Sequence, residues 1–324
     1  MMNQENIQRA REELRRSYPD LPIPQTSYLV LSTARSGSTL MCRHLTEIGY
    51  GRPIEAFNSN VNPRKRLNWG IDYNDPYAFM KKVIEYQTVN GVFGMKLSPN
   101  QFNLFLSTAR KLLEGAHIDL NDAELLEVYF PNAKYIHLQR RKKVKQAISY
   151  AKALQNGIWR ETSDQDDAYK KYLLPAMYDR EHIECCFDVL MTNDIFWQQL
   201  LRDNQIPHLV VWYEDLAAEY VTKMTEIYDF LGITDKEVIA PPLRKQSNKE
   251  SDDWEQRFTS ETPWLQDPRI ARAYAESDLD TVYLARARML MLAREQQRWK
   301  SMPANHLKPI RSFLFKVKRK LSKA

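Results

Sequence analysis

The chain has 324 residues, of which 43% are hydrophobic and 27% charged, and its formal net charge at pH 7 is +6. These proportions are close to those of globular domains and exclude a disordered or collagen-like chain, and no apolar run is long enough to cross a bilayer. With only 9 glycines, an all-β fold dense in tight turns is disfavoured, and we expect helices around an internal sheet.

The positive charge is concentrated in the C-terminal tail. Residues 308–324 contain seven Lys or Arg and no acidic residue, which leaves 40 basic and 41 acidic side chains in the rest of the chain. A nucleic-acid binder needs a basic face on the fold itself, so we expect no nucleic-acid partner. The apolar residues of the tail share one helical stripe, which predicts an amphipathic helix on an anionic membrane; the alternative is a frayed or docked terminus.

Cysteines and histidines give no sign of a disulfide framework or a metal site. The three cysteines, Cys42, Cys185 and Cys186, form no CxxC motif, and the six histidines lie far apart in the sequence. The N-terminal stretch is too polar for a signal peptide. We therefore predict a metal-free, cytoplasmic protein, peripheral at the inner face of a membrane if the tail binds lipid.

Taken in chain order, the apolar pattern alternates between helices and short strands. A leading helix at 7–18 is ended by the prolines of 18–24, and an apolar strand follows at 28–32. Helical segments are expected at 40–48, 101–114, 142–155 and 183–203, and further strands at 92–96, 134–138 and 208–212. This alternation predicts an α/β fold with a mostly parallel sheet, helices on both faces and a helical cap within 160–205.

The loop after the first strand is a candidate anion site. Residues 33–39 read TARSGST, with Gly37 for a tight backbone turn, Arg35 as a planar cation, and hydroxyls from Ser36, Ser38 and Thr39. The loop lacks the Gly-Lys-Ser/Thr ending of a Walker A motif, which counts against an ATPase. The alternative is a serine-rich turn that only caps the next helix.

A basic cluster follows the strand at 134–138. It consists of Arg140, Arg141, Lys142, Lys143 and Lys145, at the start of the helix that carries Ser149. Cations at a helix N-terminus oppose its dipole unless an anion lies there, so the cluster is a second candidate for anion binding. The alternative is a solvated basic turn. In YEDL at 213–216 we expect a structural loop, because adjacent acids on a strand point to opposite faces.

Six stretches, taken together, resemble a known family. They are YLVLSTARSGSTL at 28–40, GRPIEAFN at 51–58, NGVFGMKLSPNQF at 90–102, the segment 135–160, VVWYEDL at 210–216 and RKQSNKESDDWEQRF at 244–258. Their order is similar to that of sulfotransferases that use 3′-phosphoadenosine 5′-phosphosulfate. The nearest resemblance is to the bacterial trehalose 2-sulfotransferase-like family, whose relatives include nodulation-factor and lipopolysaccharide sulfotransferases.

The resemblance implies how the nucleotide donor binds. The loop Arg35–Thr39 would hold the 5′-phosphosulfate as a P-loop-like phosphosulfate loop. Arg140 or Arg141, together with Ser149, would bind the 3′-phosphate, and both arginines remain candidates. The segment 244–254 would form a loop over the nucleotide, with Lys245 where the family has arginine.

The resemblance also implies the catalytic groups. Glu55 would be the general base for the acceptor hydroxyl, while Arg35 and Lys96 would stabilise charge on the leaving oxygen and the sulfuryl group. Ala56–Phe57 replaces the family's pair of aromatic residues, so the acceptor need not be trehalose. Replacing Glu55 with Gln should abolish transfer while nucleotide binding survives.

We therefore expect a sulfotransferase acting on a carbohydrate or glycolipid, which the family suggests is a homodimer. The alternatives are a nucleotide-dependent kinase and a non-catalytic anion-binding membrane adaptor. The expected organisation is an N-terminal helix and linker at 1–27, a sulfotransferase domain at 28–262, and a helical extension with the basic tail at 263–324.

Overall fold

The computed structural model describes residues 2–58, 69–159, 175–242, 249–276, 278 and 280–287. The chain divides into two compact units that interleave along the sequence. The first comprises Met1–Gln139 and Phe196–Pro242, and the second comprises Arg140–Ile195 and Leu243–Ala324. The single sulfotransferase domain at 28–262 stays a prediction beside this division.

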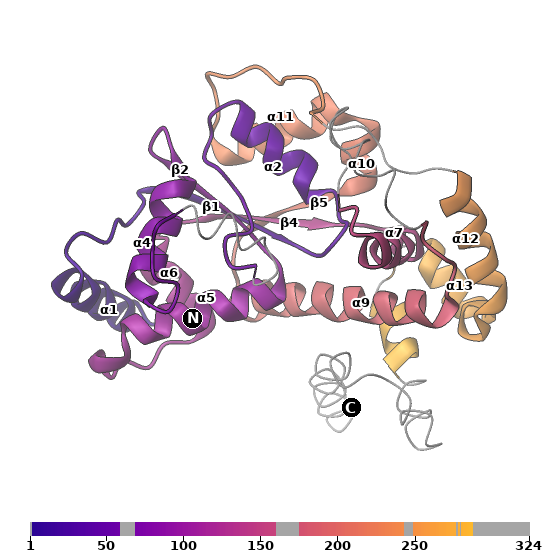
Figure 1. Ribbon diagram of the computed structural model, residues 1–324, viewed down its shortest axis with the longest axis horizontal. Helices are drawn as coiled ribbons and strands as arrows, with labels where there is room; N and C mark the ends of the chain where they lie inside the picture. Colours follow the sequence, from indigo (N-terminus) through magenta and orange to yellow (C-terminus); the bar gives the residue numbers. More distant parts are fainter. Residues whose placement is uncertain are drawn as a thin grey trace. The chain divides into compact units, whose positions relative to one another are not determined.

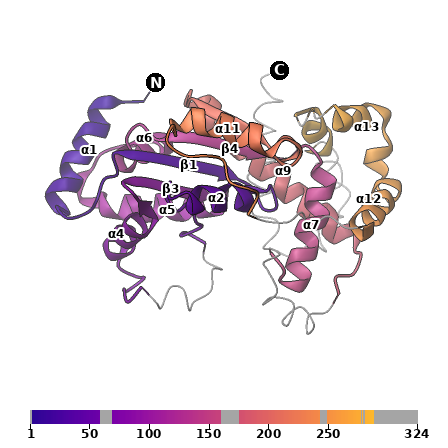
Figure 2. The same cartoon turned by 90° about the horizontal axis from the view of Figure 1, so that it is seen from above.

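The first unit is built on a five-stranded sheet in the order β2-β3-β1-β4-β5. Its strands are β1 (Thr26–Ser32), β2 (Thr88–Val89), β3 (Val92–Leu97), β4 (Lys134–Gln139) and β5 (His208–Trp212). β1 lies between β3 and β4 and pairs parallel with both, with Val30 opposite Lys96 and Ile136 (Figure 2). Only the short β2 runs antiparallel, against β3. The predicted, mostly parallel sheet is confirmed.

Helices cover both faces of this sheet, as predicted (Figure 1). The side chains of a strand alternate between faces. Leu29 and Leu31 of β1 therefore enter one core cluster, while Tyr28 and Val30 enter the other. The first cluster is covered by α1 (Gln4–Ser17), α4 (Pro76–Gln87), α5 (Pro99–Leu112), α6 (Asp122–Tyr129) and the C-terminal turns of α9 (Arg180–Asp203). The second is covered by α2 (Ser38–Glu47), α10 (Tyr213–Ala218) and α11 (Tyr220–Leu231).

Helix ends follow local sequence signals. Asp75 caps α4 by accepting from the backbone N–H groups of Tyr77 and Ala78, and Pro76 occupies the first helical position. Asn121 and Glu124 form a capping box on α6. These short-range contacts fix where each helix starts beside the sheet.

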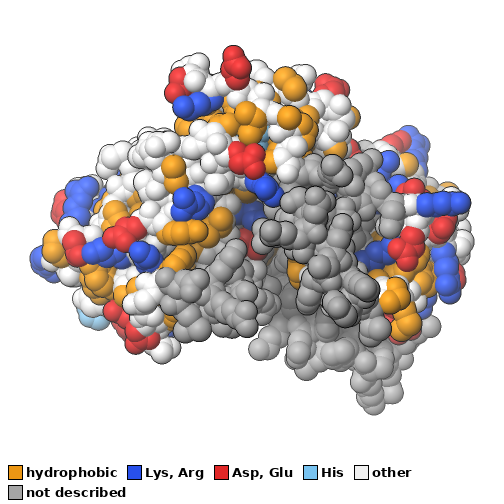
Figure 3. All heavy atoms as spheres, turned by 45° about the horizontal axis from the view of Figure 1, so that its top comes forward, with side chains coloured by type: hydrophobic (Ala, Val, Ile, Leu, Met, Phe, Trp, Pro, Cys, Tyr) orange, Lys and Arg blue, Asp and Glu red, His pale blue; other side chains and the backbone are white. Residues whose placement is uncertain are grey.

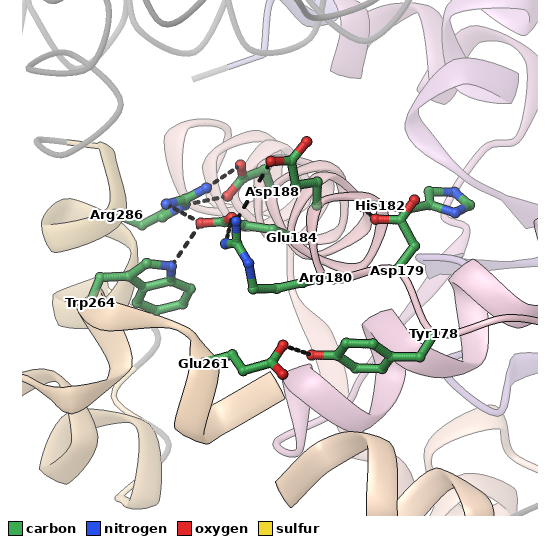
Figure 4. A network of polar contacts seen from close by, with 10 residues as sticks. Tyr178, Asp179, Arg180, His182, Glu184, Asp188, Glu261, Trp264 and Arg286 are labelled. Carbon is green, nitrogen blue, oxygen red and sulfur yellow. Dashed lines mark hydrogen bonds and ion pairs between the residues drawn. The ribbon is translucent and has the colours of Figure 1, made fainter. Parts of the chain in front are cut away.

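The second unit contains helices around a buried ionic network. Its elements are α7 (Lys143–Asn156), the N-terminal part of α9, α12 (Lys249–Glu261), the 3-10 helix η2 (Pro263–Gln266), α13 (Pro268–Ala275) and a helical segment at 280–287. Arg286 contacts Asp188 through two nitrogens, at 2.8 and 3.0 Å, and its third nitrogen lies 2.7 Å from Glu184 (Figure 4). Trp264 Nε1 also donates to Glu184, at 3.0 Å.

Three local expectations need correction. Tyr213–Ala218 is the helix α10 and not a loop, and its first turn holds Glu214 and Asp215, where acids suit the helix dipole. Residues from 249 onward form α12, so the expected nucleotide loop at 244–254 is helical in its second half. The hairpin partner β2 was also missed, although Asn90–Gly91, both at positive φ, is a strong hairpin turn signal.

Candidate functional site

The loop between β1 and α2 is shaped to expose the N-terminus of a helix. Gly37 has φ +87° and stands as the N-cap of α2, and Arg35 adopts the left-handed region at φ +60°. The first N–H groups of a helix have no partner within it, and the dipole there attracts negative charge. The N-cap of α2 is a glycine, which has no side chain to cap the helix. The alternative that the serines of this loop serve only as a helix cap is therefore not supported.

Gly37 is also required by a close contact. A Cβ built on Gly37 would lie 2.2 Å from Cδ2 of Tyr213, the first residue of α10. The parallel strands β1 and β5 end at the same edge of the sheet, which brings the two following segments together. Sequence reasoning missed Tyr213, although its place directly after a strand was a usable signal.

Ser36 points to a ligand in this loop. Its side chain is fully buried, and its Oγ has no hydrogen-bond partner among the residues that the structure describes. Buried hydroxyls are almost always hydrogen-bonded, so one left without a partner beside a helix N-terminus fits a missing acceptor such as a phosphate or sulfate oxygen.

A carboxylate and an ammonium lie beside the loop. Lys96, near the end of β3, places its Nζ 2.8 Å from Oε1 of Glu55 and 3.3 Å from Oγ1 of Thr39. An isolated bridge between Ile54 and Met95 holds the Glu55 segment against β3. The structure thus brings three of the predicted site residues, Thr39, Glu55 and Lys96, into one chain of contacts.

The surroundings of Glu55 determine its charge. Burial acts to raise the pKa of Glu55, but the ammonium of Lys96 and hydrogen bonds from Lys96, Asn58 and Gln101 outweigh it and hold the pKa below its ordinary value. The side chain is 35% exposed. Glu55 is therefore an ionised carboxylate that solvent or a substrate can reach.

The helix that leads out of the loop is anchored at its far end. His44 of α2 is fully buried, with Nδ1 2.7 Å from the hydroxyl of Tyr220 and Nε2 2.6 Å from that of Tyr228. Burial lowers the pKa of His44, so it stays neutral, with one ring nitrogen donating and the other accepting. Both tyrosines belong to α11, which fixes α2 on this face of the sheet.

The other residues predicted to bind the nucleotide, Arg140, Arg141 and Ser149, belong to the second unit. Arg140 and Arg141 follow β4 directly and are partly buried, and Ser149 lies on α7. Two lysines of the basic cluster have carboxylate partners, Lys143 on Asp194 and Lys145 on Asp252 and Glu255. These three contacts place carboxylates beside two of the five residues of the cluster.

Ser149 lies on the α7 face that carries Lys145 and Lys152, since the three are spaced four and three residues apart. Both lysines contact α12, with Lys152 2.8 Å from Glu250 and 4.3 Å from the Trp254 ring centroid. This face is therefore the one directed at α12. Lys245 and the tail at 308–324 lie outside the described residues.

Over the described residues, charges of both signs are mixed, and neither a cluster of metal ligands nor a membrane-spanning helix is found. Basic and acidic side chains are interspersed on the face in Figure 3, in line with the near balance of charge before the tail. Within the described ranges, no three His, Cys, Asp or Glu side chains gather as a metal site would need. None of the described helices has the length and apolar character required to cross a bilayer.

The fold and the loop define an α/β protein with a helix N-terminus at the carboxyl edge of a parallel sheet, beside a paired carboxylate and ammonium. Sequence comparison assigns the class. Residues 27–261 match the sequence model of the family described as Stf0 sulphotransferase, and the chain belongs to that family. The protein is a sulfotransferase and uses a sulfuryl donor.

Two characterised relatives are similar over most of the chain. The trehalose 2-sulfotransferase of Mycobacterium tuberculosis is 29% identical over 74% of this chain and 96% of its own length. That of Mycolicibacterium smegmatis is 27% identical over 72% and 94%. The solved sulfotransferase domain of a Synechococcus olefin synthase is 20% identical and covers 71% of this chain and 80% of that one. The TM-score between the two structures is 0.34.

Proposed function

We propose that the chain transfers a sulfuryl group from 3′-phosphoadenosine 5′-phosphosulfate to a hydroxyl of a carbohydrate or glycolipid. The main support for this proposal is the series of contacts from Thr39 through Lys96 to Glu55. These contacts join the loop at Arg35–Thr39 to a carboxylate that a substrate can reach. The carbohydrate acceptor is supported by the two relatives, both of which are trehalose 2-sulfotransferases. The glycolipid variant of the acceptor rests on the predicted membrane affinity of the tail.

In this proposal each site residue has one chemical task. The donor supplies the sulfuryl group, and its 3′,5′-adenosine bisphosphate part is the leaving group. Glu55 accepts the proton of the acceptor hydroxyl while that oxygen forms its bond to sulfur. Lys96 and Arg35 stabilise the negative charge that collects on the departing phosphate oxygen as the sulfur–oxygen bond breaks.

The loop residues bind and orient the donor. Ser36, Gly37, Ser38 and Thr39 offer backbone N–H groups and hydroxyls at the start of α2, and the buried Oγ of Ser36 is the observation that fits an anion there. We assign the 3′-phosphate to Arg140 or Arg141, together with Ser149, and the cover of the nucleotide to the segment that contains Lys245. These assignments rest on the family resemblance.

Thermal unfolding in the presence of the product nucleotide tests the donor class. A ligand of the native state at about 100 times its dissociation constant adds roughly 2.7 kcal/mol, so 3′,5′-adenosine bisphosphate should raise Tm by several degrees. An Arg140→Ala/Arg141→Ala protein is the matched control and should lose the shift. A shift with ATP and magnesium but none with the bisphosphate would contradict the proposal and favour the kinase.

A further inference from the structure

Both oxygens of the Glu55 carboxylate accept a hydrogen bond, each from a different segment. Lys96 of β3 lies 2.8 Å from Oε1, and Nδ2 of Asn58 donates to Oε2 at 3.0 Å. Asn58 sits in a turn that starts at Glu55 itself, because its backbone N–H donates to the Glu55 carbonyl at 3.2 Å. The amide is therefore held beside the carboxylate by local backbone geometry.

A second amide approaches Glu55 from the junction between β3 and α5. Gln101 is only 6% exposed, and it occupies the third position of α5, where it forms a capping box with Ser98. The backbone N–H of Ser98 donates to Oε1 of Gln101 at 3.4 Å. With its carbonyl oxygen used in the cap, Gln101 has its NH₂ group left to donate, and Gln101 is among the groups that lower the pKa of Glu55.

The three groups that lower the pKa of Glu55 arise from one short stretch of chain and one turn. Lys96 and Gln101 are five residues apart, separated by the end of β3 and the first turn of α5, and Asn58 comes from the facing segment. The turn and the cap each constrain one of the amides before any substrate is present. A carboxylate whose two oxygens each contact a fixed donor loses rotational freedom.

We propose that Asn58 and Gln101 are positioning residues that, together with Lys96, hold the Glu55 carboxylate in one orientation toward the acceptor hydroxyl. This inference rests on the proposed function, in which Glu55 is the base. Neither amide touches the reacting atoms. Their effect on transfer passes through the orientation and the proton affinity of Glu55.

Removal of either amide should change the pKa of Glu55, which a loss of packing alone would not do. Donors to a carboxylate stabilise its charged form, so the loss of one raises the pKa of Glu55. A hydrogen bond to a charged group is strong enough to shift a pKa by roughly one unit. The acidic limb of the pH profile of kcat/KM reports the base in the free enzyme and should move upward by the same amount.

The test measures the Glu55 pKa directly in the full-length protein. Carboxyl carbons of labelled glutamate are followed by NMR during a pH titration, and the Glu55 signal is identified by its loss in the Glu55→Gln variant. Asn58→Ala removes one donor. Gln101→Glu retains a residue that suits the capping box and replaces the other donor with a second carboxylate. Both should raise the Glu55 pKa, by roughly one unit or more.

Ser98→Ala is the matched control, because it weakens the cap of α5 without removing a donor to Glu55. It should lower Tm and leave the Glu55 pKa unchanged. An unchanged pKa in both Asn58→Ala and Gln101→Glu overturns the inference, and so does a shift in Ser98→Ala equal to theirs.

Turnover with 3′-phosphoadenosine 5′-phosphosulfate and trehalose separates this inference from the proposed function. Full activity in Glu55→Gln would refute the base role, and it would remove the reason for calling the amides positioning residues. An upward shift of the acidic limb in Asn58→Ala and Gln101→Glu, but not in Ser98→Ala, supports both.

Discussion

Each unit contains a carboxylate paired with a cation, and the two carboxylates behave in opposite ways. Glu55 in the first unit is 35% exposed, and its pKa is lowered because Lys96 and the neighbouring amides outweigh burial. Asp188 in the second unit is 3% exposed, and burial raises its pKa even though Arg286 contacts both of its oxygens.

The difference separates the chemical role proposed for Glu55 from a structural role of Asp188. The cost of removing a charge from water grows with burial, and beyond some depth a single partner no longer compensates for it. Asp188 and Arg286 connect α9 to the helical segment at 280–287 (Figure 4), and both side chains are buried. Glu55 keeps both its charge and a path to solvent, which a base requires.

The largest expected effect comes from removing the reachable carboxylate. Glu55→Gln should reduce turnover by about 10²- to 10⁴-fold, the usual contribution of a general base. Steady-state kinetics with trehalose as the acceptor provide the measurement. Glu47→Gln, at an exposed ion pair with Arg43 in the same unit, is the control and should retain turnover. Near-native turnover in Glu55→Gln would place the chemistry elsewhere.

Removal of Arg286 should mainly reduce stability, whereas removal of Lys96 should mainly reduce activity. Arg286→Met leaves Asp188 buried and unpaired, which should lower the free energy of unfolding by about 3–5 kcal/mol. Lys96→Met leaves a partly exposed carboxylate, with a loss of only about 1 kcal/mol, yet it should abolish transfer. Chemical denaturation and turnover measured on both variants check this. Equal destabilisation by the two substitutions would remove the contrast between the sites.

A smaller effect is expected at the loop glycine. Gly37→Ala and Gly91→Ala each place a side chain at positive φ, at about 1–2 kcal/mol. Only at Gly37 does the new Cβ meet a ring, that of Tyr213, while Gly91 has open space around it. Gly37→Ala should therefore lose more stability and also the Tm shift with the bisphosphate. An unchanged shift would show that the loop does not hold the nucleotide.

The smallest effect is the pH dependence of stability, which should have opposite signs at the two carboxylates. The stabilising contribution of Glu55, whose folded pKa is lowered, is present above its unfolded pKa of about 4.3 and is lost as the pH falls through the folded value. The folded pKa of Asp188 is raised, so its contribution falls as the pH rises from about 3.9.

Thermal unfolding between pH 6 and pH 3 can show these signs. The stability advantage of the wild type over Glu55→Gln should shrink on acidification. The Arg286→Met/Asp188→Leu protein lacks the ion pair as a whole. On acidification, the stability of the wild type relative to this variant should increase. Parallel changes in the two comparisons would contradict the assigned pKa directions.

The parallel strands of the sheet were predicted from local patterns and are confirmed. The strands at 28–32, 92–96, 134–138 and 208–212 appear within two residues of their observed ends, because short apolar runs between helices identify buried parallel strands. The tight turn expected at Gly37 is also present, at φ +87°. The family resemblance, which depends on six stretches together, is confirmed by the match over 27–261.

What the sequence could not supply were contacts made across the fold. The packing of Tyr213 on Gly37 joins residues 176 positions apart, and the contacts of His44 with Tyr220 and Tyr228 are as distant. The periodicity of a single chain carries no information on such pairs. YEDL at 213–216 was expected to be a loop because the preceding strand pattern was extended into it, whereas a helix begins at Tyr213.

The ammonium of Lys96 is shared between two sides of the site. It lies 2.8 Å from Glu55 and 3.3 Å from Thr39, so an anion in the loop and the carboxylate compete for one positive charge. Linkage makes this competition reciprocal: whatever draws Lys96 toward the loop makes Glu55 a stronger proton acceptor, and protonation of Glu55 tightens the hold on the anion. In the proposed mechanism, a single lysine thereby couples the binding of the sulfuryl donor to the proton affinity of Glu55.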